Sequence, residues 1–278
     1  MSDSDDARRL PPEVVDYYTQ FREESRLETG SFQLEFKRTK ELLERFLPEP
    51  PARIVDVGGG AGAYAFWLAS LGYQVDLVDA TPRLVEEARR RNRGSRHTLR
   101  SIEDGDACRL EIGDAAADGV LLLGPLYHLP ARADRIAALH EARRVLGPNG
   151  VAFAAGISRY AATLDGLTRN LALDPQVVSM RDKALVDGQY RNDTNAPTYF
   201  VTAYLHRPED LVEELTEAGY RNVRVFAVEG PGWLMPDFDA RWNDAARRNA
   251  LLHVARLLEE EKSMVGASAH LLAVGKPV

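Results

Sequence analysis

Short apolar runs alternate with helical patterns along residues 52–157, and this alternation is the strongest constraint on the fold. Each apolar run is typical of a buried strand, and each segment between them has the spacing of an amphipathic helix. The apolar runs are ARIVDVG (52–58), YQVDLVDA (73–80), DGVLLLG (118–124) and GVAFAAGI (150–157). Repeated alternation of this kind is typical of a parallel sheet with helices on both faces. The sequence therefore predicts an α/β fold.

The rest of the chain departs from this alternation. Helical patterns at 13–27 and 31–47 precede the first strand. Residues 158–204 contain two further helical patterns and a turn-rich stretch, which indicates an insertion over one edge of the sheet. Residues 198–206 alternate like a strand, which puts Phe200, Thr202, Tyr204 and His206 on one face. Two more strands are predicted at 222–229 and 268–276, with a helical connection between them.

Charge and composition exclude several classes of partner. The net charge of −7 disfavours nucleic acid, because its phosphates would be repelled. The single cysteine, Cys108, excludes a disulfide framework and a cysteine-rich metal site, and no other metal-ligand spacing occurs, so no metal is expected. No apolar stretch is long enough to span a membrane, and the acidic first residues do not resemble a signal peptide. We therefore expect a cytoplasmic protein with a small-molecule partner; self-association stays open.

The glycine-rich stretch VDVGGGAGAY (55–64) follows a predicted strand and opens a predicted helix. Gly58-x-Gly60-x-x-Ala63 fits the fingerprint of dinucleotide-binding folds. Asp56-x-Gly58-x-Gly60-x-Gly62 fits the first motif of class I S-adenosylmethionine-dependent methyltransferases. Asp79, at the end of the next strand, suits the ribose hydroxyls of either ligand, so this part of the sequence leaves both open.

Four further features resemble the methyltransferase family or a subgroup of it. Asp106 and Ala107 stand where the family's GDA site meets the adenine, and the final strand pair resembles the family's reversed last strand. Residues 132–156 resemble its helix–turn–strand segment, in which the helix ends at RVL and PNG turns into the next strand. GPLYHL (124–129) resembles a bacterial small-molecule subgroup, some of whose members act in secondary metabolism. This resemblance implies a Rossmann-like, mostly parallel seven-stranded sheet with the last strand antiparallel. It also implies an N-terminal helical lid (1–47) and a core (48–278) that carries an acceptor cap at about 158–204.

The resemblance also implies a binding site for S-adenosylmethionine, with S-adenosylhomocysteine as product. The residues expected to bind it lie in the glycine turn, after the next three strands, and on the lid: Asp56, Gly58, Gly59, Gly60, Asp79, Ala80, Asp106, Ala107, Leu123, Gly124 and Tyr18.

The acceptor side is less constrained by the sequence. His128 is the first candidate for a general base, because an unperturbed imidazole titrates near neutrality, and Tyr127 stands beside it. A capping or packing role for both residues stays open. The predicted acceptor-binding residues lie in the cap and after the strands: Tyr160, Tyr204, His206, Glu229 and Trp233. His270 is expected to be structural, because it lies within a predicted strand.

Three functions remain compatible with the sequence. The favoured function is methyl transfer to a small organic acceptor by in-line displacement. A nicotinamide-dependent oxidoreductase is the second, although no Tyr-x-x-x-Lys pair supports it. The third is a protein that binds S-adenosylmethionine without catalysis.

Overall fold

The structure is a computed structural model that describes residues 10–20, 23–192 and 199–278. Nine strands are described within these ranges. Their bounds are β1 (Arg53–Val57), β2 (Gln74–Asp79), β3 (Ser101–Asp104), β4 (Ala117–Leu122), β5 (Leu146–Ser158), β6 (Gln189–Tyr190), β7 (Ala203–His206), β8 (Tyr220–Ala227) and β9 (His270–Pro277).

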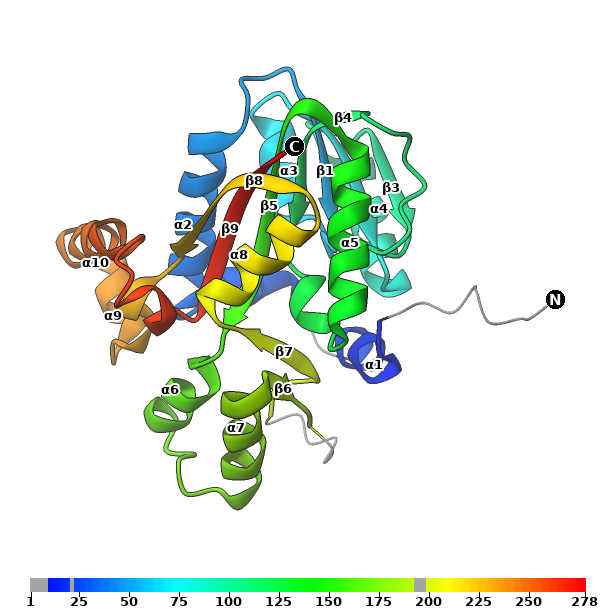
Figure 1. Cartoon of the computed structure of the whole chain (residues 1–278). Helices are drawn as coiled ribbons and strands as arrows, with labels where there is room; N and C mark the ends of the chain where they lie inside the picture. Colours follow the sequence, from blue (N-terminus) through cyan, green and yellow to red (C-terminus); the bar gives the residue numbers. More distant parts are fainter. Residues whose placement is uncertain (1–9, 21–22, 193–198) are drawn as a thin grey trace.

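The α-helices alternate with the strands in the first half of the chain and gather in groups after β5 (Figure 1). Their bounds are α1 (Pro12–Gln20), α2 (Phe32–Phe46), α3 (Ala63–Ser70), α4 (Pro82–Gly94), α5 (Arg132–Val145), α6 (Ala161–Thr168), α7 (Pro175–Asp187), α8 (Pro208–Glu217), α9 (Phe238–Asn243) and α10 (Ala245–Leu258). Short 3-10 helices are η1 (Glu23–Glu28), η2 (Leu126–His128), η3 (Gly230–Leu234) and η4 (Val265–Ala267).

Seven strands form one twisted sheet in the order β3-β2-β1-β4-β5-β9-β8. The strands from β3 to β5 are parallel, whereas β9 runs antiparallel to both of its neighbours. The predicted mostly parallel sheet with a reversed last strand is therefore confirmed. The short pair β6–β7 extends the sheet at the carboxyl end of β5. Strand β7 lies within the strand predicted over 198–206, whereas β6 was not predicted.

The sheet is covered by helices on both faces because its strands are apolar on both sides. Val120 and Leu122 of β4 pack with α5 and α8, whereas Leu121 between them packs on the opposite face with α2, α3 and α4. Alternation along a strand sends neighbouring side chains to opposite faces. Buried strands of this kind are typical of parallel sheets.

The predicted N-terminal segment has two parts in the structure. Leu42 and Leu43 of α2 are fully buried in the core beside Ile54 of β1, so α2 is a layer of the core. Helix α1 instead contacts α4 near the carboxyl ends of the strands. The helix predicted over 13–27 ends earlier, since α1 stops at Gln20 and η1 follows.

The segment after β5 carries α6, α7 and the β6–β7 pair, and it projects from the carboxyl end of the sheet (Figure 1). It has its own small apolar core, which contains Met180, Ala184, Tyr190, Ala203 and Leu205. Among the described residues, no helix combines the length and the apolar character needed to cross a membrane.

Candidate functional site

The glycine turn after β1 packs too tightly against its neighbours to accommodate a side chain at Gly58. Gly58 has a φ of +70°, and a Cβ there would lie 2.7 Å from the Pro125 ring. Gly60 has a φ of +56°, a conformation that glycine adopts at little cost. The GPLYHL segment therefore packs directly onto the glycine turn, which explains why the two motifs occur together in this chain.

Asp79 holds this turn from the end of β2. Its Oδ2 accepts a hydrogen bond from the Gly60 N–H at 2.8 Å, and its Oδ1 accepts one from the Thr81 N–H at 2.8 Å. Burial raises the pKa of Asp79 above its ordinary value, although these two N–H groups oppose that rise. Each carboxylate oxygen retains a further lone pair with which it can accept a ligand hydroxyl.

Asp56 lies beneath the turn and is only 1% exposed. Among the described residues, its Oδ2 has no hydrogen-bond partner. Burial raises the pKa of Asp56 to about 7, and the nearby Asp79 carboxylate adds to the rise. A buried carboxylate with an unsatisfied oxygen is costly for a folded chain unless a ligand compensates it, so Asp56 fits a ligand that carries positive charge.

A cavity of about 240 Å³ opens above the glycine turn, and we call it the donor cavity. Every residue predicted to bind the methyl donor lines it: Tyr18, Asp56, Gly58, Gly59, Gly60, Asp79, Ala80, Asp106, Ala107, Leu123 and Gly124. The carboxyl ends of parallel strands are the usual place for ligands in this type of sheet. The donor cavity therefore fits the predicted cofactor in position and in chemistry.

His128 and Tyr127 also line the donor cavity, and both are held by the protein. The Tyr127 hydroxyl donates to the Leu123 carbonyl at 3.0 Å. Nε2 of His128 lies 2.8 Å from the Tyr18 hydroxyl, and its Nδ1 lies 3.4 Å from the Thr202 carbonyl. Burial lowers the pKa of His128 to about 4, so this imidazole is neutral at physiological pH.

A second cavity of about 300 Å³ adjoins the first, and we call it the acceptor cavity. Four residues line both cavities: Tyr18, Arg26, Tyr127 and His270. Its walls are largely aromatic and apolar, and several come from the segment after β5, among them Ala162, Tyr190 and Phe200. Glu229 and Trp233, both predicted to bind the acceptor, line this cavity.

Tyr160, Tyr204 and His206 line neither cavity, contrary to the sequence prediction. Tyr160 is 42% exposed beside Gly266. Tyr204 and His206 alternate with Leu205 along β7, and it is Leu205 that faces the acceptor cavity. Because alternate residues of a strand point to opposite sides, both ring side chains turn away from the cavity.

Tyr204 and His206 instead surround a buried ion pair. Arg135 of α5 and Glu214 of α8 are 1% and 2% exposed, and their side chains lie 2.7 Å apart. The Arg135 guanidinium lies 3.6 Å from the centre of the Tyr204 ring, and Nε2 of His206 lies 3.4 Å from Oε2 of Glu214. These contacts join α5, α8 and β7, so the two rings have a structural position.

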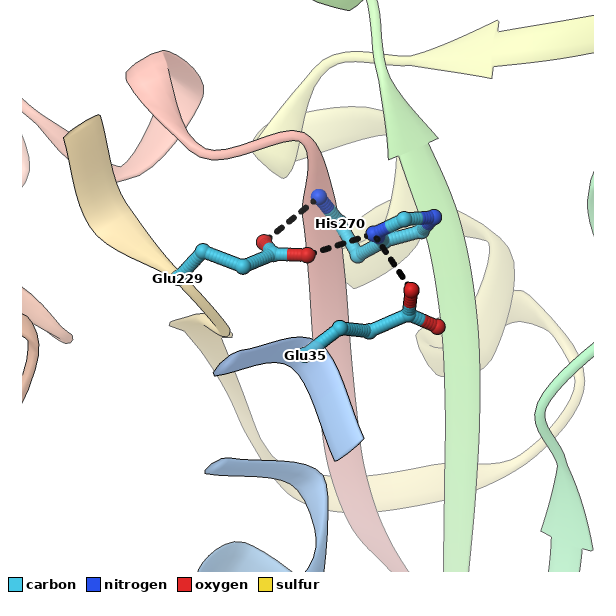
Figure 2. A group of neighbouring side chains, drawn as sticks. All are labelled: Glu35, Glu229 and His270. Carbon is cyan, nitrogen blue, oxygen red and sulfur yellow. Dashed lines mark hydrogen bonds and ion pairs between the residues drawn. The ribbon is translucent and has the colours of Figure 1, made fainter. Parts of the chain in front are cut away.

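The sequence prediction missed a cluster that Figure 2 shows, formed by Glu35, Glu229 and His270. Nδ1 of His270 lies 2.6 Å from Oε1 of Glu229 and 3.7 Å from Oε2 of Glu35. Arg26 forms two hydrogen bonds with Glu35, at 2.7 and 3.1 Å. A signal for this cluster exists in the sequence: a reversed last strand begins at the edge where its parallel neighbours end, so its first residue, His270, belongs to the site.

Comparison with known proteins agrees with this site. The methyltransferase domain family matches residues 55–154, which run from within β1 to within β5 of the sheet. The chain is similar to a demethylmenaquinone methyltransferase of Deinococcus radiodurans, with 31% identity over 179 residues, or 63% of this chain and 70% of that protein. It is also similar to a ubiquinone biosynthesis O-methyltransferase of Xanthomonas campestris, with 33% identity over 119 residues, or 41% of this chain and 46% of that protein.

The fold is similar to that of an S-adenosylmethionine-dependent methyltransferase from Mesorhizobium loti. The TM-score is 0.57 at 18% identity, with 87% of this chain and 99% of that chain covered. The family match, the relatives and the fold agree with the donor cavity built around Asp56, Gly58 and Asp79. The chain belongs to the S-adenosylmethionine-dependent methyltransferases of class I.

Proposed function

We propose that this protein transfers the methyl group of S-adenosylmethionine to a hydroxyl group of a small, largely aromatic acceptor. The observation that carries the proposal is the pair of adjoining cavities, which share Tyr18, Arg26, Tyr127 and His270 as common walls. A donor in one cavity and an acceptor in the other would meet at these four residues. Bound S-adenosylmethionine supplies a methyl group activated by a sulfonium, so positioning of the two substrates contributes most of the acceleration.

The donor cavity favours a ligand with positive charge over an anionic dinucleotide. Five carboxyl side chains line it, those of Glu35, Asp56, Asp79, Glu87 and Asp106, against the two guanidinium groups of Arg26 and Arg91. We assign Asp79 to the ribose hydroxyls, Asp106 to the adenine amine and the glycine turn at 58–60 to the methionine part. Asp79 would serve either ligand, so the buried Asp56 beneath the glycine turn is the group that supports methyl transfer against the nicotinamide alternative, whose pyrophosphate it would repel.

The acceptor cavity supports a compact apolar substrate. Its volume of about 300 Å³ lies at the lower end of the range for small-molecule sites. One relative is named a demethylmenaquinone methyltransferase and the other a ubiquinone biosynthesis O-methyltransferase. Both names refer to quinone rings, which agree in size and shape with the aromatic walls seen here, and the O-methyl transfer named for the second supports a hydroxyl group as the acceptor. The GPLYHL segment is consistent with a bacterial small-molecule enzyme, and we extend the proposal to secondary metabolism.

We further propose that α1 is the lid of the donor site and that residues 158–204 form the acceptor cap. Val14 and Tyr18 of α1 line the donor cavity, while Ala161, Ala162 and Gly166 of α6 line the acceptor cavity. An acceptor enclosed by such a cap is a free small molecule and not nucleic acid. Self-association is not required, because all the walls named here come from one chain.

The test is formation of S-adenosylhomocysteine with a panel of phenols, catechols and hydroquinones, matched with anilines and thiophenols of the same shape. We expect turnover with hydroxylated rings. Ala162→Phe should fill part of the acceptor cavity, raise KM for the acceptor and leave S-adenosylhomocysteine affinity unchanged. Ala246→Phe, on the exposed side of α10, is the matched control and should change neither quantity. Turnover of the amines alone would contradict the hydroxyl assignment, and no turnover with any member of the panel would contradict the aromatic acceptor.

A further inference from the structure

The boundary between the two cavities is where a methyl group would pass from donor to acceptor. Of the four residues that line both cavities, the two tyrosines already hydrogen-bond within the protein. Arg26 is a permanent cation and cannot accept a proton. His270 is therefore the member of this set with a side chain suited to proton transfer near neutral pH.

The ring of His270 is held in one orientation by Glu229. Oε1 of Glu229 lies 2.6 Å from Nδ1, while its Oε2 accepts the His270 main-chain N–H at 3.0 Å and the Ser268 hydroxyl at 2.6 Å. An ionised carboxylate can only accept hydrogen bonds, so in the neutral ring the proton is on Nδ1. The lone pair of the neutral imidazole is then on Nε2.

Nε2 points away from both carboxylates in Figure 2. Within the described parts of the chain it makes no hydrogen bond, and the His270 side chain retains 17% of its surface accessible. Since His270 lines both cavities, the accessible part of its ring faces the space where donor and acceptor would meet.

The charges around His270 favour its protonated form. Burial alone would lower the pKa of His270, but the carboxylates of Glu35 and Glu229 outweigh burial and raise the pKa above its ordinary value. Arg26 opposes this rise to a smaller extent. Among the described residues, these three side chains, from α2, from the residue stretch just after β8 and from η1, are the charged groups that act on the ring.

We propose that His270 is the proton acceptor of the methyl transfer and that Glu229 is its positioning residue. This inference rests on the proposed function. A lone pair of the acceptor oxygen forms the new bond to the methyl carbon as the methyl–sulfur bond breaks. The sulfur keeps the bonding pair and becomes the thioether of S-adenosylhomocysteine, and the hydroxyl proton moves to Nε2 of His270. The resulting imidazolium is stabilised by Glu229 and Glu35 and releases its proton to water after the product leaves.

The side chains of Glu35, Glu229 and His270 are close enough to hold a cation, but their existing contacts argue for a proton instead. Glu35 already binds Arg26 through both oxygens, and Oε1 of Glu229 is directly hydrogen-bonded to Nδ1 of His270. A metal would have to displace both contacts. The proposal therefore requires that activity be unaffected by EDTA.

The kinetic test uses the full chain and whichever hydroxylated acceptor the panel identifies. His270→Asn should lower kcat by about 10²-fold or more, the usual contribution of a general base, with little change in S-adenosylhomocysteine affinity. In the wild type kcat should rise with pH to a plateau above the pKa of His270, and this dependence should disappear in His270→Asn. Imidazole should partly restore His270→Ala. His253→Asn, an exposed histidine on α10, is the control and should behave as wild type.

A second measurement needs no acceptor. In the S-adenosylhomocysteine complex, ¹⁵N spectra recorded above the pKa of His270 should show a neutral ring protonated on Nδ1, and this pKa should fall in Glu229→Gln. A ring protonated on Nε2, or Zn²⁺ binding that abolishes the titration, would overturn the proposal even if methyl transfer is observed. An unchanged kcat in His270→Asn would also overturn the proposal. Absence of turnover in the wild type, with the expected tautomer present, would instead count against the proposed acceptor class.

Discussion

The Tyr18 hydroxyl lies 2.8 Å from Nε2 of His128, which ties the first helix to the segment that follows β4. The Thr202 carbonyl near Nδ1 can only accept, so the ring proton belongs on Nδ1 and Nε2 accepts from Tyr18. Both ring nitrogens are thus engaged by the protein. This geometry favours a structural role for His128, in which it holds α1 against the donor site, over its predicted role as general base.

Tyr18→Phe should loosen α1 without unfolding the protein. The substitution removes the donor for a buried ring nitrogen, at a cost of about 1–3 kcal/mol. We expect faster hydrogen exchange over residues 12–20 and weaker binding of S-adenosylhomocysteine, because Tyr18 also lines the donor cavity. Tyr73→Phe removes a similar hydrogen bond, to the Pro48 carbonyl at 2.8 Å, and should leave ligand affinity unchanged. Equal effects of the two substitutions would argue against a lid role for α1.

His128 should make the fold sensitive to mild acid. Its pKa is lowered to about 4 in the folded protein from an ordinary 6.5, so the unfolded chain binds more protons between these values. The free energy of unfolding should therefore fall as pH drops from about 6.5 to 4, by about 3 kcal/mol from this group. His128→Asn should show a smaller fall in urea unfolding measured across this range. An identical pH dependence in the variant would contradict the buried neutral imidazole.

Asp56 should have the opposite effect to His128 on how the free energy of unfolding depends on pH. Its pKa is raised to about 7 in the folded protein from 3.8, so the folded chain binds more protons between these values and stability falls as pH rises through them. Asp56→Asn should raise the free energy of unfolding at pH 8, by up to about 4 kcal/mol. Thermal unfolding at pH 5 and pH 8 measures the difference, which should be larger at pH 8.

The same carboxyl group should control affinity for the methyl donor. Ionised Asp56 attracts the sulfonium and the ammonium, so wild-type affinity for S-adenosylmethionine should increase from pH 6 to pH 8 in calorimetric titrations. Asp56→Asn should bind more weakly at pH 8 and lose most of this increase. Asp118→Asn is the control, because Asp118 is an exposed carboxylate at the opposite end of β4. If the affinity of Asp56→Asn still increased with pH, the pH dependence would have to come from another titrating group.

Asp79→Ala should weaken the binding of S-adenosylmethionine and of S-adenosylhomocysteine by the same factor, since the two ligands share the ribose. The substitution also removes the acceptor for the Gly60 and Thr81 N–H groups. Hydrogen bonds to a charged group contribute about 1.5–3 kcal/mol, so we expect a loss of about tenfold to a hundredfold in both dissociation constants. A selective loss for S-adenosylmethionine would show that Asp79 acts through charge and not through the ribose.

The donor site was predictable because its residues are local in sequence. Asp56, the glycine turn and Asp79 lie at the ends of adjacent strands, so the strand–helix alternation alone brings them together. The His270 cluster was not predicted, because it joins α2, the end of β8 and the start of β9, which are distant in the sequence. The reversal of β9 was itself predicted; applying it to His270 would have placed this residue at the carboxyl edge of the sheet and not in the middle of a strand.

The prediction that Tyr204 and His206 bind the acceptor was wrong for a different reason. Alternation correctly put Tyr204 and His206 on the same side of β7, but the sequence does not say which side faces the cavity. That choice is made by the pairing of β7 with the end of β5 and by α8, whose Glu214 binds His206. In a strand with this ambiguity, a shift of one residue exchanges the two faces.

The buried pair Arg135–Glu214 should be essential for stability and irrelevant to ligand binding. Removing one partner leaves a buried charge uncompensated, so Glu214→Gln should cost about 3–5 kcal/mol in urea unfolding, while S-adenosylhomocysteine affinity of the folded fraction stays unchanged. Arg132–Glu217 joins the same two helices at 2.6 Å, but its partners are about half exposed. Glu217→Gln is therefore the matched control and should cost less than about 1 kcal/mol. Because Tyr204 and His206 pack around the buried pair, His206→Asn should follow Glu214→Gln in lowering stability; a selective rise in KM for the acceptor would instead return His206 to the substrate site.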